Sequence, residues 1–131
     1  MAKPKPPKVT WAAEPLAHDY PAAAAYLGLL LPPAAVPAVV DAFRGSPTTH
    51  HRANDLLRAS GLPLLPVDDP EVVNDTRKMK SGEALAPVLL VRGELSAGRA
   101  LTIADGYHRI CASYHVDEDA DIPGRLVELP G

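Results

Sequence analysis

An apolar run that gives way directly to a helical pattern is the most constraining feature of this chain. It occupies residues 103–112, Ile-Ala-Asp-Gly-Tyr-His-Arg-Ile-Cys-Ala, and the change comes at Asp105-Gly106. A helix that starts there presents its first, unpaired backbone amides and the positive end of its dipole, and both favour an anion. Gly106 lets a ligand approach the backbone, and Arg109 adds a planar fork that matches phosphate oxygens. The segment therefore predicts a phosphate-binding helix start at residues 106–109.

Length and charge narrow the class of protein. The chain has 131 residues, which is enough for one domain with a single core. Its net charge is −3, so it has no overall basic field of the kind found in proteins that bind nucleic acids or anionic membranes. Neither nucleic acid nor membrane is therefore expected as a partner.

The single cysteine bears on the cellular compartment, and the prolines bear on whether the chain crosses a membrane. A single cysteine cannot form an intramolecular disulfide, so we expect a reducing compartment, the cytoplasm. The stretch from Pro21 to Val40 carries no charge and is long enough to raise the question of a membrane span. Because Pro32, Pro33 and Pro37 interrupt it, the stretch predicts two short helices instead.

Prolines at first helical positions define the expected elements of the N-terminal half. Residues 1–10 form a basic arm with little to bury and are expected to be disordered. Helices are expected over residues 21–31, 33–45 and 47–61. We interpret residues 19–61 as a helical subdomain.

After Gly61 the pattern changes to strands and helices in alternation. Residues 62–67 are extended, with prolines that suit an edge strand or no strand. The elements expected next are, in order, a helix over 70–80, strands over 88–91 and 101–103, a helix over 106–116 and a strand over 126–129. This β-α-β-β-α-β order over residues 62–131 predicts an α/β (α+β) fold in one domain, with a small mixed sheet covered by residues 19–61.

Gly106, His108, Arg109 and Ala112 form the pattern G-x-H-R-x-x-A between the last two expected strands. The pattern and the order of elements around it, over roughly residues 62–130, resemble the ParB N-terminal domain and sulfiredoxin superfamily. The resemblance implies a site for nucleotide phosphates, since ParB clamps bind CTP, sulfiredoxin binds ATP and the related free-serine kinases bind ADP. It also implies that His108 and Arg109 contact phosphate oxygens, with help from the amides near Gly106.

Two features depart from the sulfiredoxin pattern. Tyr107 stands where sulfiredoxin has its catalytic cysteine, so peroxiredoxin repair is not expected. The helix from Pro70 lacks the phosphate-contacting pattern of sulfiredoxin, although Arg77, Lys78 and Lys80 supply positive charge.

The lone cysteine falls on an apolar helix face. Tyr107, Ile110, Cys111 and Tyr114 have the i, i+3, i+4, i+7 spacing of one buried face. We therefore interpret Cys111 as an inert core thiol and Tyr107, at the edge of this face, as a residue that flanks the ligand.

The candidate site residues also have structural alternatives. Arg109 can form a surface salt bridge with Asp105 in place of binding phosphate, and His108 can serve as a cap or a surface residue. Asp105 suits the N-cap of the helix, but a carboxylate so close to a bound phosphate can also hold Mg²⁺ or act as a catalytic base.

Two other groups of polar residues have spacings that resemble those of functional sites. His51, Asp55 and Arg58 share one face of the helix expected over 47–61, a pattern typical of a polar surface or of a substrate cleft. The acidic run at 117–121 starts like a calcium loop, but Ile122 stands where that loop needs glycine, so a solvated turn is expected. No metal site is predicted.

These observations together predict a nucleotide-phosphate-binding enzyme that transfers or hydrolyses a phosphoryl group. The phosphates of ATP, ADP or CTP would be bound by Gly106, Tyr107, His108 and Arg109. Asp105 would bind Mg²⁺ or accept a proton, and a small molecule would be the acceptor. The alternative is a non-enzymatic, nucleotide-gated module that acts on DNA or a protein partner. The acidic balance, and the expectation that no helix-turn-helix follows the motif, disfavour a DNA clamp. A third alternative is a scaffold that keeps the fold without the ligand.

Overall fold

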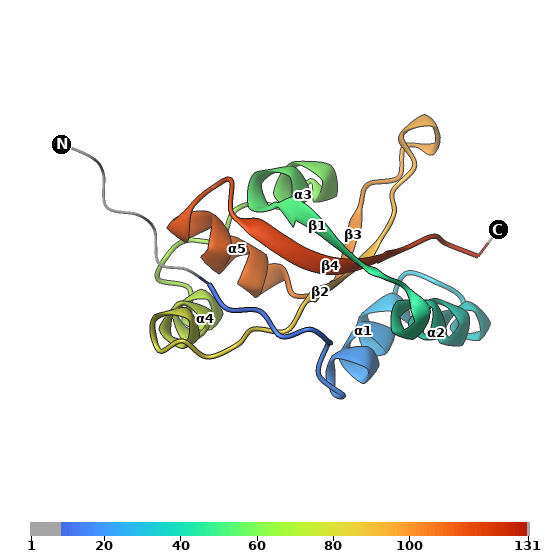
Figure 1. Ribbon diagram of the computed structural model, residues 1–131. Coiled ribbons are helices and arrows are strands. Elements are labelled where there is room, and N and C mark those ends of the chain that lie inside the picture. The colour runs from blue at the N-terminus through green and yellow to red at the C-terminus, as the bar shows by residue number, and fades with distance from the viewer. Residues whose placement is uncertain (1–8, 131) are drawn as a thin grey trace.

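One mixed sheet of four strands organises the part of the chain, residues 9–130, that the computed structural model describes (Figure 1). The strands are β1 (Thr48–Arg52), β2 (Val88–Val91), β3 (Thr102–Asp105) and β4 (Asp121–Val127), and their order in the sheet is β1-β4-β2-β3. β4 pairs antiparallel with β1 and parallel with β2, while β2 and β3 form an antiparallel hairpin. The predicted α/β class with a small mixed sheet is confirmed. Of the predicted basic arm, residues 1–8 lie outside the described part.

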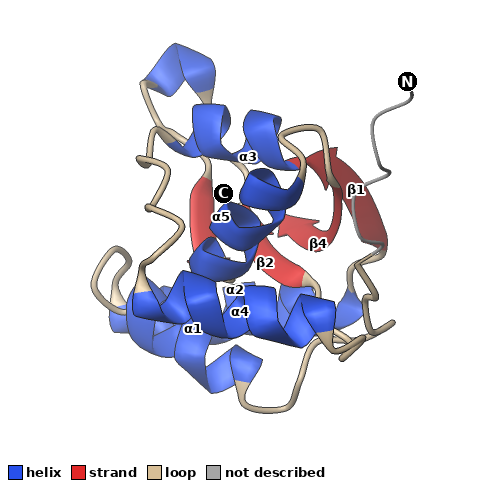
Figure 2. Ribbon diagram, turned by 90° about the vertical axis from the view of Figure 1, so that its left-hand side faces the viewer, coloured by secondary structure: helices blue, strands red, loops and turns tan. Residues whose placement is uncertain are grey.

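Helices cover both faces of the sheet (Figures 1 and 2). They are α1 (Asp19–Leu27), α2 (Val36–Gly45), α3 (Ala53–Ser60), α4 (Pro70–Lys80) and α5 (Tyr107–Val116). Side chains alternate across β2: Val88 and Leu90 enter a core with α3, α4 and α5, while Leu89 and Val91 enter a second core with α1 and α2. The continuous apolar run of this strand is thus explained by burial on both faces.

A local capping signal predicted α4. Asp69 accepts hydrogen bonds from the amides of Glu71 and Val72 at 3.0 and 3.1 Å, and Pro70 occupies the first helical position of α4. Both ends of α4 therefore match the prediction. α1 ends at Leu27, earlier than expected, and the segment before α2 begins as a short 3₁₀ turn.

Residues 48–52 contradict the predicted helix over 47–61. They form β1, which pairs with β4 from Thr48 opposite Arg125 to Arg52 opposite Asp121, and α3 starts only afterwards. Threonine is β-branched and suits a strand, and pairing with β4 overrides the capping signal of Pro47. The predicted helical subdomain therefore contributes a strand, and His51 does not share a helix with Asp55 and Arg58.

The last strand begins earlier than the predicted range of 126–129. Pro123 lies opposite His50 of β1, and pairing with β2 begins only at Gly124, so the missing proline amide leaves no gap in the β2 ladder. A Cβ on Gly124 would lie 3.1 Å from side-chain atoms of Val88 and Leu90, so glycine allows the close packing there. Residues 62–67 form no strand, and the second half is therefore α-β-β-α-β.

No helix within residues 9–130 combines the length and the apolar character needed to cross a membrane. The uncharged stretch from Pro21 to Val40 is divided between α1 and α2, as its prolines predict.

Candidate functional site

The strand-to-helix turn at Gly106 has the predicted form. β3 ends at Asp105, Gly106 adopts a φ of +108°, and α5 begins at Tyr107. A Cβ at Gly106 would collide with the side chain of Val88 and would lie 2.9 Å from Nη2 of Arg109. Both the backbone conformation and the close approach of these neighbours therefore require glycine.

The amides at the start of α5 are unpaired. Ile110 is the first residue of the helix whose amide has a hydrogen-bond acceptor: it donates to the carbonyl of Gly106 at 3.0 Å. In the described part of the chain, the amides of Tyr107, His108 and Arg109 donate to no protein acceptor, and no side chain caps the helix. These donors, with the helix dipole behind them, are the groups that favour an anion.

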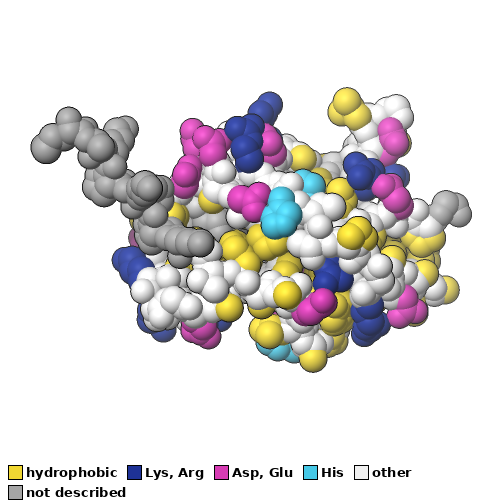
Figure 3. Space-filling view, viewed as in Figure 1, with side chains coloured by type: hydrophobic (Ala, Val, Ile, Leu, Met, Phe, Trp, Pro, Cys, Tyr) yellow, Lys and Arg dark blue, Asp and Glu magenta, His cyan; other side chains and the backbone are white. Residues whose placement is uncertain are grey.

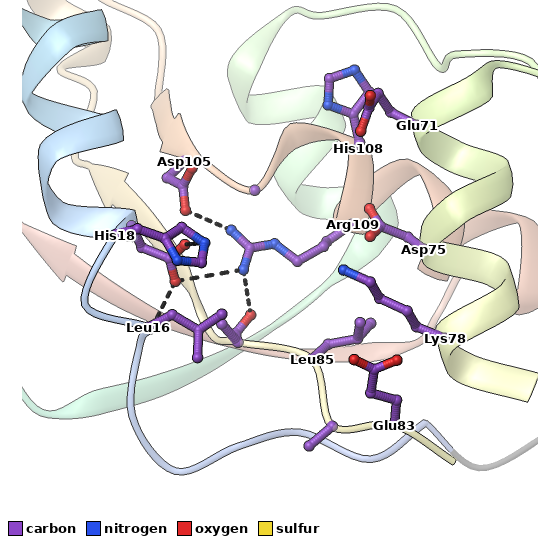
Figure 4. A pocket seen from close by; sticks show the side chains of 14 residues that line it. Leu16, His18, Glu71, Asp75, Lys78, Glu83, Leu85, Asp105, His108 and Arg109 are labelled. Atoms are coloured by element: carbon purple, nitrogen blue, oxygen red, sulfur yellow. Dashed lines mark hydrogen bonds and ion pairs between the residues drawn. The ribbon is translucent and has the colours of Figure 1, made fainter. Parts of the chain in front are cut away.

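A pocket of about 230 Å³ opens beside this helix start (Figure 4). Its walls come from the start of α1 and the segment before it, from α4, from the segment that leads into β2, and from the turn between β3 and α5. The lining residues are Leu16, His18, Asp19, Glu71, Asp75, Lys78, Glu83, Ala84, Leu85, Ala86, Asp105, Gly106, His108 and Arg109. Carboxylates outnumber the two cationic side chains, Lys78 and Arg109, so the side chains alone make the pocket acidic.

Arg109 is held by protein groups on one wall of this pocket. Its Nη2 donates to Oδ2 of Asp105 at 2.7 Å, and its Nη1 donates to the carbonyl of Ala86 at 3.0 Å. Nη1 also lies 3.9 Å from Oδ2 of Asp19, and the Arg109 side chain is only 13% exposed. The structure thus shows the salt bridge with Asp105 that the sequence allowed, in a buried rather than a surface setting. Within residues 9–130, the other three of the five guanidinium N–H groups donate no hydrogen bond.

Asp105 does not cap α5, contrary to one of its predicted alternatives. Gly106 is the capping residue, and the Asp105 carboxylate turns to Arg109 instead. Burial raises the pKa of Asp105, the nearby charge of Asp19 raises it further, and Arg109 opposes both effects. Asp105 therefore belongs to a buried cluster of one guanidinium and two carboxylates.

The opposite wall is formed by α4. Glu71, Asp75 and Lys78 lie at i, i+4 and i+7, so they share one face of that helix, and all three line the pocket. Asp75 is only 8% exposed, and within residues 9–130 its carboxylate has neither a hydrogen bond nor an ion pair. Burial raises its pKa, against the opposing charges of Lys78 and Arg109.

The sequence-based prediction missed Asp75, Glu71 and Asp19. The i, i+4, i+7 spacing on α4 was the available signal for the first two, but nothing local showed that this face meets α5. Asp19 was assigned only to the opening of a helix. Its carboxylate accepts from the amide of Leu16 at 2.8 Å and faces Arg109 from the other half of the chain.

The predicted phosphate-binding residues do not all reach the pocket with their side chains. Gly106, His108 and Arg109 line it. The hydroxyl of Tyr107 instead donates to the carbonyl of Pro63 in the loop before α4, so only its backbone amide is placed at the helix start. Cys111 is fully buried on the same helix, and burial raises the pKa of its thiol. The predicted apolar face of this helix is confirmed.

Several charged side chains outside the pocket are paired with one another. On the face seen in Figure 3, acidic and basic side chains are interspersed. His50 pairs with Asp121 at 2.6 Å, and Arg52 pairs with Asp55 and Asp119, so several charges near β1 are already matched. Across residues 9–130, no three histidine, cysteine or acidic side chains are grouped so that they could hold a metal ion.

No protein-family model, curated protein or solved structure matches this chain.

Proposed function

We propose that the pocket binds the phosphate groups of a nucleotide at the start of α5. The observation that carries the proposal is the set of unpaired amides of Tyr107, His108 and Arg109, which follow a glycine beside the pocket. Lys78 adds a positive charge from the facing helix and has no ion pair within the described residues. The resemblance of the motif at residues 106–112 to the nucleotide-binding motif of the ParB and sulfiredoxin superfamily supports the same ligand.

The size of the pocket limits what it encloses. Pockets that bury a whole drug-sized ligand have volumes of roughly 300–1,000 Å³. At about 230 Å³, this pocket has room for phosphate groups and a small second group. We therefore place the base and ribose of ATP, ADP or CTP outside the enclosed space.

The acidic side chains favour a phosphate that arrives with a cation. Mg²⁺ is commonly bound by one or two carboxylates together with phosphate oxygens, and it needs no cage of protein ligands. Asp105 is the carboxylate at the helix start, and we propose it as the residue beside such an ion. The ion would offset the repulsion between the phosphate and the carboxylates of Asp19 and Asp105.

Phosphoryl transfer or hydrolysis is the reaction proposed for this site, with a small-molecule acceptor in the case of transfer. Both reactions depend on positioning and on electrostatic stabilisation of phosphate charge, which the amides and Lys78 would supply. The single buried cysteine fits a reducing compartment, and we propose the cytoplasm.

Calorimetric titration with ATP, ADP and CTP, each with and without Mg²⁺, tests the proposal. Lys78→Ala should weaken binding about 10- to 150-fold, as expected for the loss of one charged hydrogen bond. Lys80→Ala is the matched control, because Lys80 lies on the same helix but does not line the pocket. Failure of the wild-type chain to bind any of the three nucleotides, or equal affinities for the two variants, would reject the site.

A further inference from the structure

Asp75 is a largely buried acid whose carboxylate has no hydrogen-bond or ion-pair partner among residues 9–130. Its neighbours are Glu71 and Lys78 on its own helix, and His108 and Arg109 on α5. None of them forms an ion pair with it within 4.0 Å in the described part of the chain, although Figure 4 shows its carboxylate directed toward Arg109 and Lys78. Its carboxylate oxygens are not among the fully enclosed unpartnered atoms of the described residues, so they are accessible from the pocket that Asp75 lines. A ligand in the pocket that carries an O–H group can therefore donate a hydrogen bond to them.

A phosphate cannot be that donor. Near neutral pH its oxygens mostly accept hydrogen bonds, as a carboxylate does, and the two negative charges repel. The amides at the start of α5 and the carboxylate on α4 therefore bind chemically different parts of a ligand. One part is an anion, and the other carries a hydrogen that Asp75 can accept.

We infer that Asp75 is the proton acceptor for the O–H group that attacks the bound phosphate, an inference that rests on the proposed nucleotide binding. The O–H group belongs to water or to the hydroxyl of a small alcohol. Its oxygen forms a bond to the terminal phosphorus of the nucleotide while its proton passes to the Asp75 carboxylate. The bond from phosphorus to the bridging oxygen breaks, and its electron pair leaves with the shortened nucleotide.

Asp105 is less suited to this role. Its Oδ2 accepts from Arg109 at 2.7 Å, and Asp19 lies on the other side of the same guanidinium. A carboxylate bound in this way is already engaged by a cation, whereas Asp75 has only more distant charges around it. A proton acceptor works best when its pKa approaches the working pH, and burial shifts the pKa of both Asp75 and Asp105 in that direction. The difference between the two carboxylates is therefore the hydrogen bond that Arg109 donates to Asp105.

The test compares Asp75→Asn with the wild-type chain in two separate measurements. Calorimetry with ATP and Mg²⁺ reports binding, and ³¹P NMR of the reaction with ATP reports turnover, with water alone or with glycerol as the probe alcohol. Released inorganic phosphate marks water as the nucleophile, and glycerol phosphate marks the alcohol. Asp68→Asn is the matched control, because Asp68 is exposed and does not line the pocket.

Asp75→Asn should lower kcat about 10²- to 10⁴-fold, the range for loss of a general base. Its affinity for ATP should be equal or higher, because a negative charge near the phosphates is removed. The wild-type rate should fall as pH drops through the pKa of Asp75, and this acidic limb should be missing in Asp75→Asn. Asp68→Asn should match the wild type in both measurements.

Several results would overturn the inference while leaving the binding proposal intact. They are ATP binding without turnover in the wild type, unchanged turnover in Asp75→Asn, and a loss of affinity in Asp75→Asn as large as its loss of rate. The third would make Asp75 a binding residue. Absence of nucleotide binding in the wild type is a different failure, which rejects the proposed function and this inference together. A wild-type rate that shows no acidic limb would also overturn the inference, and that measurement does not depend on the folding of Asp75→Asn.

Discussion

Arg109 donates from Nη2 to the carboxylate of Asp105 at 2.7 Å across the turn that joins β3 to α5. The two residues are four positions apart, yet only Arg109 belongs to the helix. Gly106 makes the contact possible, because a Cβ at that position would lie 2.9 Å from the same guanidinium nitrogen. The ion pair therefore fixes the geometry of the helix start, and Arg109 supports the site before any ligand binds.

Arg109→Ala is expected to destabilise the fold. The substitution leaves the buried carboxylates of Asp105 and Asp19 without their cation, and breaking a buried pair in this way costs about 3–5 kcal/mol. Urea unfolding at pH 7 measures the loss. Arg92→Ala is the control, because Arg92 pairs with Glu128 on the surface and its loss should cost about 1 kcal/mol or less.

A double-mutant cycle identifies the cause of that loss. In an Asp105→Asn background, Arg109→Ala should lower the free energy of unfolding by less than it does in the wild type. The reason is that only one carboxylate, that of Asp19, then loses its cation. Equal losses in the two backgrounds would show that the ion pair does not stabilise the turn.

Gly106→Ala should cost more stability than Gly82→Ala. Both glycines have positive φ, +108° and +77°, which strains an alanine by about 1–2 kcal/mol. At Gly106 the new methyl group also meets Val88 and Arg109, and overpacking adds about 1–3 kcal/mol, whereas nothing lies within 4 Å at Gly82. Thermal unfolding of the two variants gives the comparison. Similar losses would mean that the neighbours of Gly106 can move aside.

Asp75→Asn should make the fold more stable at pH 7 than the wild type. Because burial raises the pKa of Asp75 above the ordinary value of 3.8, the folded chain holds this proton more tightly than the unfolded chain. The contribution of Asp75 to stability therefore falls as pH rises from 3.8 through its raised pKa. Above that range the ionised carboxylate destabilises the fold, and asparagine removes the penalty.

Urea unfolding of Asp75→Asn and wild type between pH 3 and pH 7 measures this difference. The gain from asparagine should vanish below about pH 3.8, where the carboxyl is protonated in both states. A gain that is constant over this range would reflect packing of the amide. A loss of stability at pH 7 would show that the Asp75 carboxylate is compensated in the folded chain.

The turn at the site could be predicted from sequence because its signals are local. An apolar run, a glycine and a helical pattern follow one another at residues 103–112, and Asp69-Pro70 starts α4 by equally local capping. Each signal acts over a few residues, so its meaning does not depend on how the rest of the chain packs.

The missed features depend on contacts between distant segments. Thr48–Arg52 became a strand because β4 lies beside it, and β4 itself runs through a proline and a glycine that alone indicate a turn. In the same way, Asp19 and Asp75 reach the pocket only because α1 and α4 pack on opposite sides of the turn. The sequence allowed a salt bridge between Arg109 and Asp105, but it gave no sign of Asp19 beside the same guanidinium, because Asp19 comes from the other half of the chain.

Cys111 should react slowly with an alkylating reagent in the folded protein and rapidly after unfolding. Its side chain is fully buried in the core beneath α5, and burial raises the pKa of the thiol, so little thiolate is present or accessible. Cys111→Ser should cost about 1–3 kcal/mol through burial of the hydroxyl, and it should leave nucleotide binding unchanged. Mass spectrometry of iodoacetamide-treated protein, in buffer and in urea, gives the two rates. Fast labelling in buffer that ATP suppresses would place the thiol at the ligand and contradict its assignment to the core.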